Sequence, residues 1–124
     1  MLSQFDKGST VTSSSVHARV GYPWLAAYPA GKGAVTAQTA TRAAERSVSG
    51  VRVNAIAPSR FPTDLSQGLL GSKWLQDIER QIPLRRTSRP DELGPAVAYF
   101  LGDHPSCMTA TRISVDGGWQ AWWA

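Results

Sequence analysis

Tyr28 and Lys32 stand four residues apart, near the start of a segment that is typical of a helix. This spacing places both side chains on one helical face. A phenol loses its proton at about pH 10, and a nearby ammonium favours the phenolate and so lowers that pKa. Such a pair can donate or accept a proton at neutral pH. The same spacing also occurs in ordinary surface pairs on helices, so it is weak evidence alone.

Ser15 strengthens the chemical interpretation because it lies 13 residues before Tyr28, at the end of a strand-like segment. A hydroxyl in that place could orient a substrate oxygen against the tyrosine. The neighbouring Ser13 and Ser14 also allow a plain serine-rich turn. Ser15, Tyr28 and Lys32 therefore form the candidate catalytic set.

The segments that must position these residues alternate between strand and helix. Residues 51–57 (VRVNAIA) form the strongest strand, an apolar run that ends at Pro58 and indicates burial on both faces. The expected order is a strand at 9–15, a helix at 34–48 beginning near Tyr28 or Pro29, the strand at 51–57, one or two short helices within 65–81, a helix at 90–101 and a strand at 111–115. This β-α-β-α-β order predicts one α/β domain with parallel crossovers.

The helix at 34–48 carries small residues at a spacing of three to four. They are Ala37, Ala40, Thr41, Ala44 and Val48. This stripe suits close packing against a helix or a sheet.

The composition is that of one ordinary globular domain. The 124 residues are 42% hydrophobic and 18% charged, with a net charge of +4. Basic residues are scattered apart from Arg85, Arg86 and Arg89, which we interpret as a solvated loop, so nucleic-acid binding ranks last among the functions. A single cysteine excludes an internal disulfide and a multi-cysteine metal site. No membrane span or signal peptide is evident, so the cytoplasm is the expected compartment.

A set of short motifs occurs in order along the chain: Ser15, then YPAGKGAV at 28–35, VRVNAIAP at 51–58, FPTD at 61–64, IPL at 82–84 with Arg86, PDEL at 90–93 and VDGG at 115–118. With these motifs, residues 8–118 resemble the C-terminal half of the short-chain dehydrogenase/reductase family. The resemblance implies the C-terminal half of a Rossmann-type, doubly wound parallel sheet, with about three parallel strands and crossover helices. In the family these would be three adjacent strands.

The resemblance also implies roles for the catalytic set. Tyr28 would be the general acid and base, and Lys32 would lower the pKa of the tyrosine and bind the nicotinamide ribose. Ser15 would hold and polarise the substrate oxygen of an alcohol or carbonyl compound. Asn54 and Asp116 would be structural, bracing loops at the strand ends.

The implied cofactor is NAD or NADP, and the loop after residue 57 would cover its nicotinamide. Besides Tyr28 and Lys32, the cofactor-binding residues would be Pro58, Ser59, Phe61 and Thr63. Ser59 stands where the family usually has a glycine. The glycine-rich phosphate loop of the family is not present, and neither the glycines at 31 and 33 nor those at 117 and 118 are expected to follow a strand and open a helix. Half of the dinucleotide site is therefore expected to be absent.

Three surfaces favour self-association. The strand edge at 9–14 would lose its partner and expose unpaired backbone groups. The face of the helix at 34–48 that meets a preceding helix in the family would also be bare, and Trp119, Trp122 and Trp123 are interpreted as an interface between subunits. We therefore expect a homo-oligomer with a small-molecule substrate and neither a nucleic-acid nor a membrane partner. The alternative function is a truncated, catalytically inactive module of the same family that oligomerises.

Overall fold

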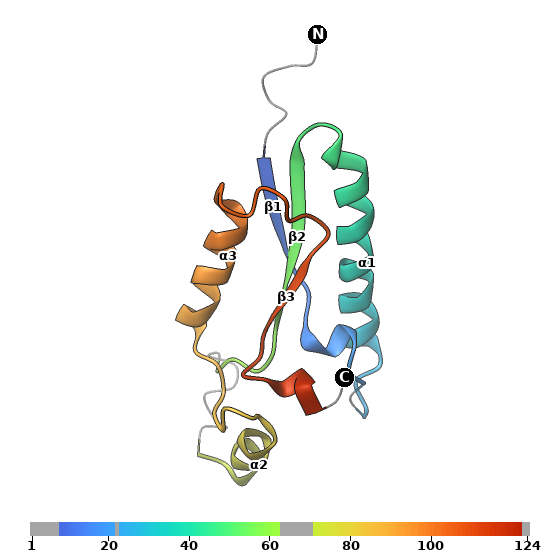
Figure 1. Cartoon of the computed structure of the whole chain (residues 1–124). Coiled ribbons are helices and arrows are strands. Elements are labelled where there is room, and N and C mark those ends of the chain that lie inside the picture. Colours follow the sequence, from blue (N-terminus) through green and yellow to red (C-terminus); the bar gives the residue numbers. More distant parts are fainter. Residues whose placement is uncertain (1–7, 22, 63–70, 123–124) are drawn as a thin grey trace.

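Three parallel strands form the centre of the computed structural model (Figure 1). The structure describes residues 8–21, 23–62 and 71–122. In sheet order the strands are β1 (Gly8–Ser13), β2 (Val51–Pro58) and β3 (Arg112–Val115). This arrangement confirms the α/β class and the three adjacent parallel strands predicted from the sequence.

Helices lie on both faces of this sheet (Figure 1). The helix α1 (Ala27–Ser47) covers one face, and α3 (Leu93–Leu101) covers the other. The helix α2 (Lys73–Gln81) lies beyond the carboxyl ends of the strands. Of the segment predicted to hold short helices, residues 65–70 fall outside the described part of the chain.

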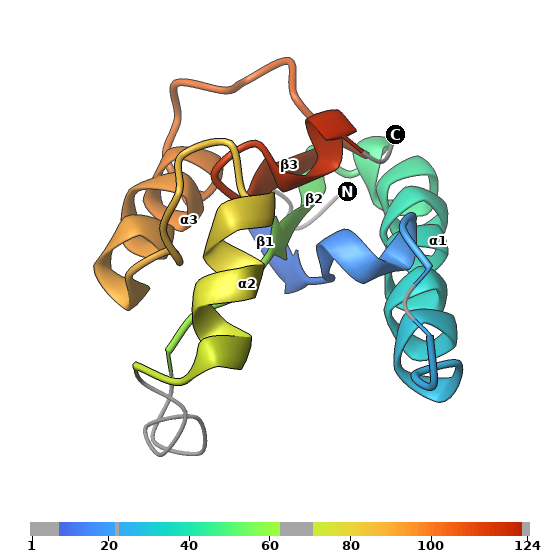
Figure 2. The same cartoon turned by 90° about the horizontal axis from the view of Figure 1, so that it is seen from below.

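Two 3-10 turns also lie at the carboxyl ends of the strands. The turn η1 (Val16–Ala18) follows β1, and η4 (Trp119–Trp122) follows β3. Figure 2, seen from below, shows η1, η4 and α2 grouped around that end of the sheet. The parallel direction of the strands thus gathers three separate segments of sequence at one edge.

The central strand β2 is the most buried element of the sheet. Its residues Val53, Asn54, Ala55, Ile56 and Ala57 are all buried. A buried strand must pair its backbone groups on both sides, and β2 pairs with β1 and with β3. The apolar run at 51–57 therefore correctly predicted a buried strand at the centre of the sheet.

Asn54 connects β2 to the loop that precedes β3. Its side chain is fully buried, its Nδ2 donates to the carbonyl oxygen of Met108 at 2.9 Å, and its Oδ1 accepts from the Thr111 amide at 3.0 Å. Both ends of the amide are thus satisfied inside the protein. The structural role expected for Asn54 is confirmed.

The helix α1 packs on the sheet through hydroxyl groups. Its buried residues are Thr39 and Ala43, and the Thr39 hydroxyl lies 2.7 Å from that of Thr12 on β1. The expected small-residue stripe does not make this contact, because it is exposed along its whole length at Ala37, Ala40, Thr41, Ala44 and Val48. The predicted helix is confirmed, and its small-residue stripe, which suited packing on either a helix or a sheet, is the exposed face rather than the face on this sheet.

The first strand is shorter than predicted because serine side chains bend its end. It stops at Ser13, and Ser15 begins the turn η1 by accepting a hydrogen bond from the backbone amide of His17 at 3.2 Å. Serine hydroxyls compete in this way with strand pairing. Ser15 therefore lies two residues beyond the strand rather than at its last position.

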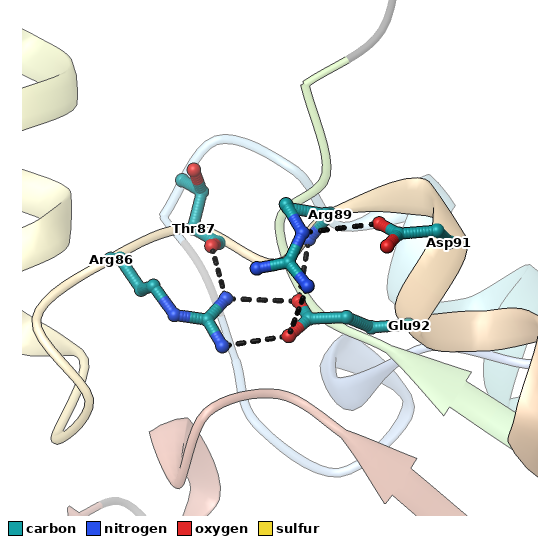
Figure 3. Close-up of polar contacts among 5 residues, drawn as sticks. All are labelled: Arg86, Thr87, Arg89, Asp91 and Glu92. Carbon is teal, nitrogen blue, oxygen red and sulfur yellow. Dashed lines mark hydrogen bonds and ion pairs between the residues drawn. The ribbon is translucent and has the colours of Figure 1, made fainter.

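A charged cluster shapes the entry into α3 (Figure 3). The Arg86 guanidinium donates two hydrogen bonds to the Glu92 carboxylate, at 2.9 and 2.7 Å, and lowers the pKa of Glu92 to about 2. Glu92 also accepts from the Arg89 amide at 2.7 Å. These bonds hold residues 90–92 in the 3-10 turn η3 (Pro90–Glu92), so the single helix predicted at 90–101 is divided. The three arginines lie in an exposed loop, as predicted.

We predict that Asn54→Ala lowers the free energy of unfolding by about 2 kcal/mol. The substitution leaves the Met108 carbonyl and the Thr111 amide without their buried partner. Denaturant unfolding followed by circular dichroism measures the change. Gln38→Ala, which removes an exposed amide from α1, is the control. Equal unfolding free energies for the two variants would contradict the bracing role of Asn54.

Candidate active site

Ser15 is fixed in place by backbone and side-chain contacts. Its side chain is buried, and its Oγ accepts the hydrogen bond from His17. Its carbonyl oxygen accepts from the Arg112 guanidinium on β3 at 3.0 Å and from the Ala18 amide at 3.1 Å. The hydroxyl therefore sits at a defined position beyond the carboxyl end of β1.

Tyr28 and Lys32 lie on one face of the first turns of α1. The Lys32 ammonium is 5.8 Å from the centre of the Tyr28 ring. The Lys32 Nζ also donates to the carbonyl oxygen of Ser13, the last residue of β1, at 2.9 Å. The predicted pairing of Tyr28 with Lys32 is therefore present, and the ammonium also ties α1 to the strand that leads to Ser15.

A second contact fixes the same part of α1. The Ser14 hydroxyl lies 2.7 Å from the Thr36 hydroxyl and donates to the Lys32 carbonyl oxygen at 3.1 Å. Backbone and side chain of Lys32 are thus both held by the end of β1. This double attachment limits how far Tyr28 and Lys32 can move relative to Ser15.

His17 completes the wall of the site next to Tyr28. Its ring is buried and meets the Tyr28 ring edge-on, with centroids 6.3 Å apart. Burial lowers the pKa of His17 from 6.5, the positive charge of Arg60 lowers it further, and a backbone hydrogen bond at Val20 partly opposes the shift. The imidazole is therefore neutral at neutral pH. In the sequence, His17 is expected to be a loop residue near the substrate cleft and not a base, and the fold adds its contact with Tyr28.

Two indole rings hold Arg60 at the same edge of the sheet. Its guanidinium lies 5.4 Å from the centre of the Trp74 ring on α2 and 5.8 Å from that of Trp119 on η4. These distances are those of cation–π contacts. The spacing of these residues in sequence gave no sign of this cluster.

Trp119 was predicted to lie at an interface between subunits, and the structure corrects this. It is 3% exposed and packs with Val16, Ile78 and Ile82 in the core of its own chain. Trp122 is exposed, and Trp123 lies outside the described residues. The aromatic tail therefore contributes one core residue to the wall of the candidate site.

The loop after β2 passes through this region. Pro58 pairs with Val115 of β3, and the Ser59 amide donates to the Val115 carbonyl oxygen at 3.1 Å. Phe61 is half-buried in the same loop, whereas Thr63 lies outside the described residues. Pro58, Ser59 and Phe61 are thus at the same edge of the sheet as Ser15.

The glycines at 117 and 118 lie differently from the expectation. They follow β3 after Asp116 and stand directly before the turn η4, so they do connect a strand to a helical turn. However, the Asp116 carboxylate accepts from the Gly118 amide at 2.9 Å and from the Gln120 amide at 3.1 Å. A protein carboxylate therefore takes the donors that a phosphate would need. The structural role expected for Asp116 is confirmed.

The donor set at this edge fits one half of a nicotinamide dinucleotide. The Lys32 ammonium has three N–H donors, one of which is on the Ser13 carbonyl oxygen, so it can also bind sugar hydroxyls. Tyr28 is 45% exposed and accessible to a small molecule. Within residues 8–21, 23–62 and 71–122, no glycine-rich turn opens a helix of eight or more residues, so those residues offer no pyrophosphate cradle.

Two other kinds of site are not found in the described residues. There, no group of three or more His, Cys, Asp or Glu side chains could hold a metal ion. None of the helices in that part of the chain is long and apolar enough to cross a membrane.

Comparisons with known proteins agree with this geometry. A family model described as "Enoyl-(Acyl carrier protein) reductase" matches residues 1–120. The 2-(S)-hydroxypropyl-CoM dehydrogenase 3 of Xanthobacter autotrophicus is 38% identical over 120 residues, which cover 93% of this chain and 47% of that protein. The inactive 2-(S)-hydroxypropyl-CoM dehydrogenase 2 of the same organism is 35% identical, over 93% of this chain and 52% of that protein.

A solved structure shows the same fold. The gluconate 5-dehydrogenase from Burkholderia cenocepacia, in complex with NADP and tartrate, superposes with a TM-score of 0.87 at 27% identity. The match covers 94% of this chain and 46% of that one. The chain belongs to the short-chain dehydrogenase/reductase family, an oxidoreductase family with a Rossmann-type fold. It spans about half the length of the curated relatives it matches.

We predict that Arg60→Gln raises the pKa of His17 back toward 6.5. The reason is that the neighbouring guanidinium charge opposes protonation of the imidazole. Because the lowered pKa makes the unfolded chain bind more protons, the contribution of His17 to stability falls as the pH drops below about 6.5. Proton NMR of the imidazole ring, assigned with a His17→Gln variant, measures the titration. Arg42→Gln on the exposed face of α1 should leave the pKa of His17 unchanged. An equal His17 pKa in the wild type, Arg60→Gln and Arg42→Gln would contradict the effect of the Arg60 charge on the imidazole.

Proposed function

We propose that the protein is an NAD(P)-dependent oxidoreductase that transfers a hydride between nicotinamide and an alcohol or carbonyl substrate. The observation that carries the proposal is the Lys32 ammonium beside the Tyr28 ring, bonded to the strand end that leads into Ser15. This attachment relates the three residues of the candidate catalytic set to one another. The family, whose members include dehydrogenases, supports the same reaction.

In the direction of reduction, Tyr28 gives its hydroxyl proton to the carbonyl oxygen of the substrate. In oxidation it takes the proton back from the alcohol, so the proton count balances against the hydride. Ser15 accepts a hydrogen bond from the His17 amide, and its own hydroxyl proton can be donated to the same substrate oxygen. Two donors on one oxygen stabilise the negative charge that develops there.

Lys32 would bind the cofactor next to the Tyr28 ring. Its ammonium donates one hydrogen bond to the Ser13 carbonyl oxygen, and its remaining N–H donors would bind the hydroxyls of the nicotinamide ribose. When bound, nicotinamide supplies or accepts the hydride. The loop with Pro58, Ser59 and Phe61 would cover the nicotinamide, whereas Thr63, which the sequence also assigned to the cofactor, lies outside the described residues.

The pyrophosphate and adenosine parts of the cofactor need protein that this chain does not provide in its described residues. Because the relatives are about twice as long, the part of the family fold that precedes β1 would supply those contacts. We propose a homo-oligomer in the cytoplasm with a small-molecule substrate, without nucleic-acid or membrane partners.

A second candidate function is a non-catalytic module that oligomerises. Two surfaces favour it: the edge of β1 that faces away from β2 has no partner strand among the described residues, and the small-residue stripe of α1 is exposed. A relative named as inactive supports the idea that members of this family can lose activity. This candidate requires that the catalytic set no longer acts on a cofactor.

We predict that Tyr28→Phe lowers kcat by about 10²- to 10⁴-fold, because it removes the proton donor without changing the shape of the ring. The assay follows oxidation of NADH and NADPH with a panel of small carbonyl compounds. Tyr99→Phe is the matched control, since Tyr99 on α3 is also 45% exposed and lies outside the candidate site.

The two candidate functions give opposite results in that assay. Turnover that depends on Tyr28 and not on Tyr99 supports the oxidoreductase. Absence of turnover and of cofactor binding, together with a defined oligomer in sedimentation, supports the non-catalytic module. Equal activity of the two variants would overturn the role of Tyr28.

A further inference from the structure

We propose that Arg112 is a positioning residue for Ser15, and that through it the turn η4 holds the hydroxyl of the candidate catalytic serine in place. The inference rests on the proposed function, because it adds a positioning residue to the same candidate site. The observation behind it is a chain of hydrogen bonds that runs from Gln120 of η4 through the Arg112 guanidinium to the Ser15 carbonyl oxygen.

The position of the Ser15 hydroxyl depends on the backbone of the turn η1. The Ser15 carbonyl oxygen accepts from the Ala18 amide at 3.1 Å and from Arg112 Nη2 at 3.0 Å. The first of these bonds lies within the turn itself. The second comes from the first residue of β3, 97 positions along the chain, and therefore fixes the turn relative to the sheet.

The other end of this chain of bonds is anchored in η4. Arg112 Nη2 also donates to Gln120 Oε1 at 3.1 Å. The Nε2 atom of the same Gln120 donates to Asp116 Oδ2 at 3.1 Å and to the Ser114 hydroxyl. The side-chain amide of Gln120 is thus bonded at its oxygen and at its nitrogen, so its oxygen keeps a defined direction toward Arg112.

An apolar contact accompanies this polar link. Trp119, the first residue of η4, belongs to the same buried core cluster as Val16, the first residue of η1. Val16 directly follows Ser15 in the chain. The two turns are therefore joined by buried apolar side chains as well as by the Arg112 bonds, and a displacement of η4 would be transmitted to Ser15.

The guanidinium of Arg112 is suited to this role because it is partly withdrawn from water. Arg112 is half-buried, and burial is the main cause that lowers its pKa; the charge of Arg19 lowers this pKa further, and Asp116 partly opposes the shift. A hydrogen bond from a cation is stronger where water is excluded. Water would therefore be a poor substitute for the Arg112 bond to the Ser15 carbonyl oxygen.

The first test is a double-mutant cycle between Arg112→Met and Ser15→Ala. It is read as the single-turnover rate of NADPH oxidation with the same panel of small carbonyl compounds and excess protein, so that slow variants remain measurable. We expect Arg112→Met to lower this rate by about 10- to 100-fold when Ser15 is present, because a misplaced hydroxyl no longer bonds the substrate oxygen. In the Ser15→Ala background the same change should lower it by less than about twofold. Equal losses in the two backgrounds would assign Arg112 to general stability and overturn the proposal.

Further variants test the two ends of the link. Arg112→Lys keeps a cationic donor and should restore part of the rate that Arg112→Met loses. Gln120→Ala removes the η4 end and should lower the rate in the same direction, again only when Ser15 is present. Arg42→Gln and Gln38→Ala, both on the exposed face of α1, are the matched controls and should leave the rate unchanged. An unchanged rate in Gln120→Ala would overturn the coupling to η4.

Amide hydrogen exchange tests the placement of Ser15 without turnover. The His17 and Ala18 amides donate to the hydroxyl and the carbonyl oxygen of Ser15, respectively. In Arg112→Met both amides should exchange about tenfold faster, whereas the Gly50 amide, beyond the far end of α1, should keep its rate. The same acceleration at all three amides would report a general loosening of the fold and overturn the proposal.

The two measurements separate this inference from the proposed function. Faster exchange at His17 and Ala18 in a chain that shows no turnover would support the placement of Ser15 by Arg112 and contradict the proposed reaction. Turnover that Arg112→Met leaves unchanged would overturn the positioning role alone. If Arg112→Met does not fold, Arg112→Lys and Gln120→Ala are compared with Ser15→Ala in the same cycle and the same exchange experiment.

Discussion

The pairing of β2 with a parallel strand on each side is the constraint on which the rest of the structure depends. β2 is buried along most of its length, so its backbone groups must be bonded by β1 and β3. Because all three strands run in the same direction, the turns that leave them meet at one edge. Ser15 and Arg60 lie at the same edge of the sheet for this reason, although they are 45 positions apart in the sequence.

Lys32 connects this sheet to the chemistry. Its ammonium binds the last carbonyl of β1 and lies beside Tyr28, so the same side chain holds α1 in place and contributes charge to the candidate site. The hydroxyl pairs between β1 and α1 reinforce that attachment. Two other parts of the same elements are not packed in this way. The small-residue stripe of α1 is exposed, and the edge of β1 that faces away from β2 has no partner strand among the described residues, so both surfaces could pack against another protein segment.

The sequence predicted those parts of the fold that local patterns encode. The apolar run at 51–57 predicts a buried strand of a parallel sheet. The four-residue spacing of Tyr28 and Lys32 predicts that both side chains lie on one face of a helix. The stripe of small residues on α1 indicated close packing but left its partner open between a helix and a sheet, and in the structure it does not pack on the sheet. The buried residues Thr39 and Ala43 lie on another face, where hydroxyls meet β1.

The parts that could not be predicted depend on contacts between distant segments. Arg60 and Trp119 are far apart in the sequence, and their cation–π contact requires the loop after β2 to meet the turn after β3. The sequence placed His17 near the substrate cleft, but its edge-on contact with Tyr28 depends on how η1 packs against α1. The role of Asp116 also needed the structure, because its carboxylate accepts hydrogen bonds from the amides of Gly118 and Gln120 in the turn after β3.

The central claim is that the carboxyl edge of this sheet binds nicotinamide and its ribose. Its most direct test is a titration of the chain with NADPH and with reduced nicotinamide mononucleotide, followed by nicotinamide fluorescence excited through the tryptophans. The account predicts that both ligands bind with similar affinity and that Lys32→Met removes the signal of both, because the described residues contact only the part that the two ligands share. Absence of binding by either ligand, or binding that survives Lys32→Met, would contradict it.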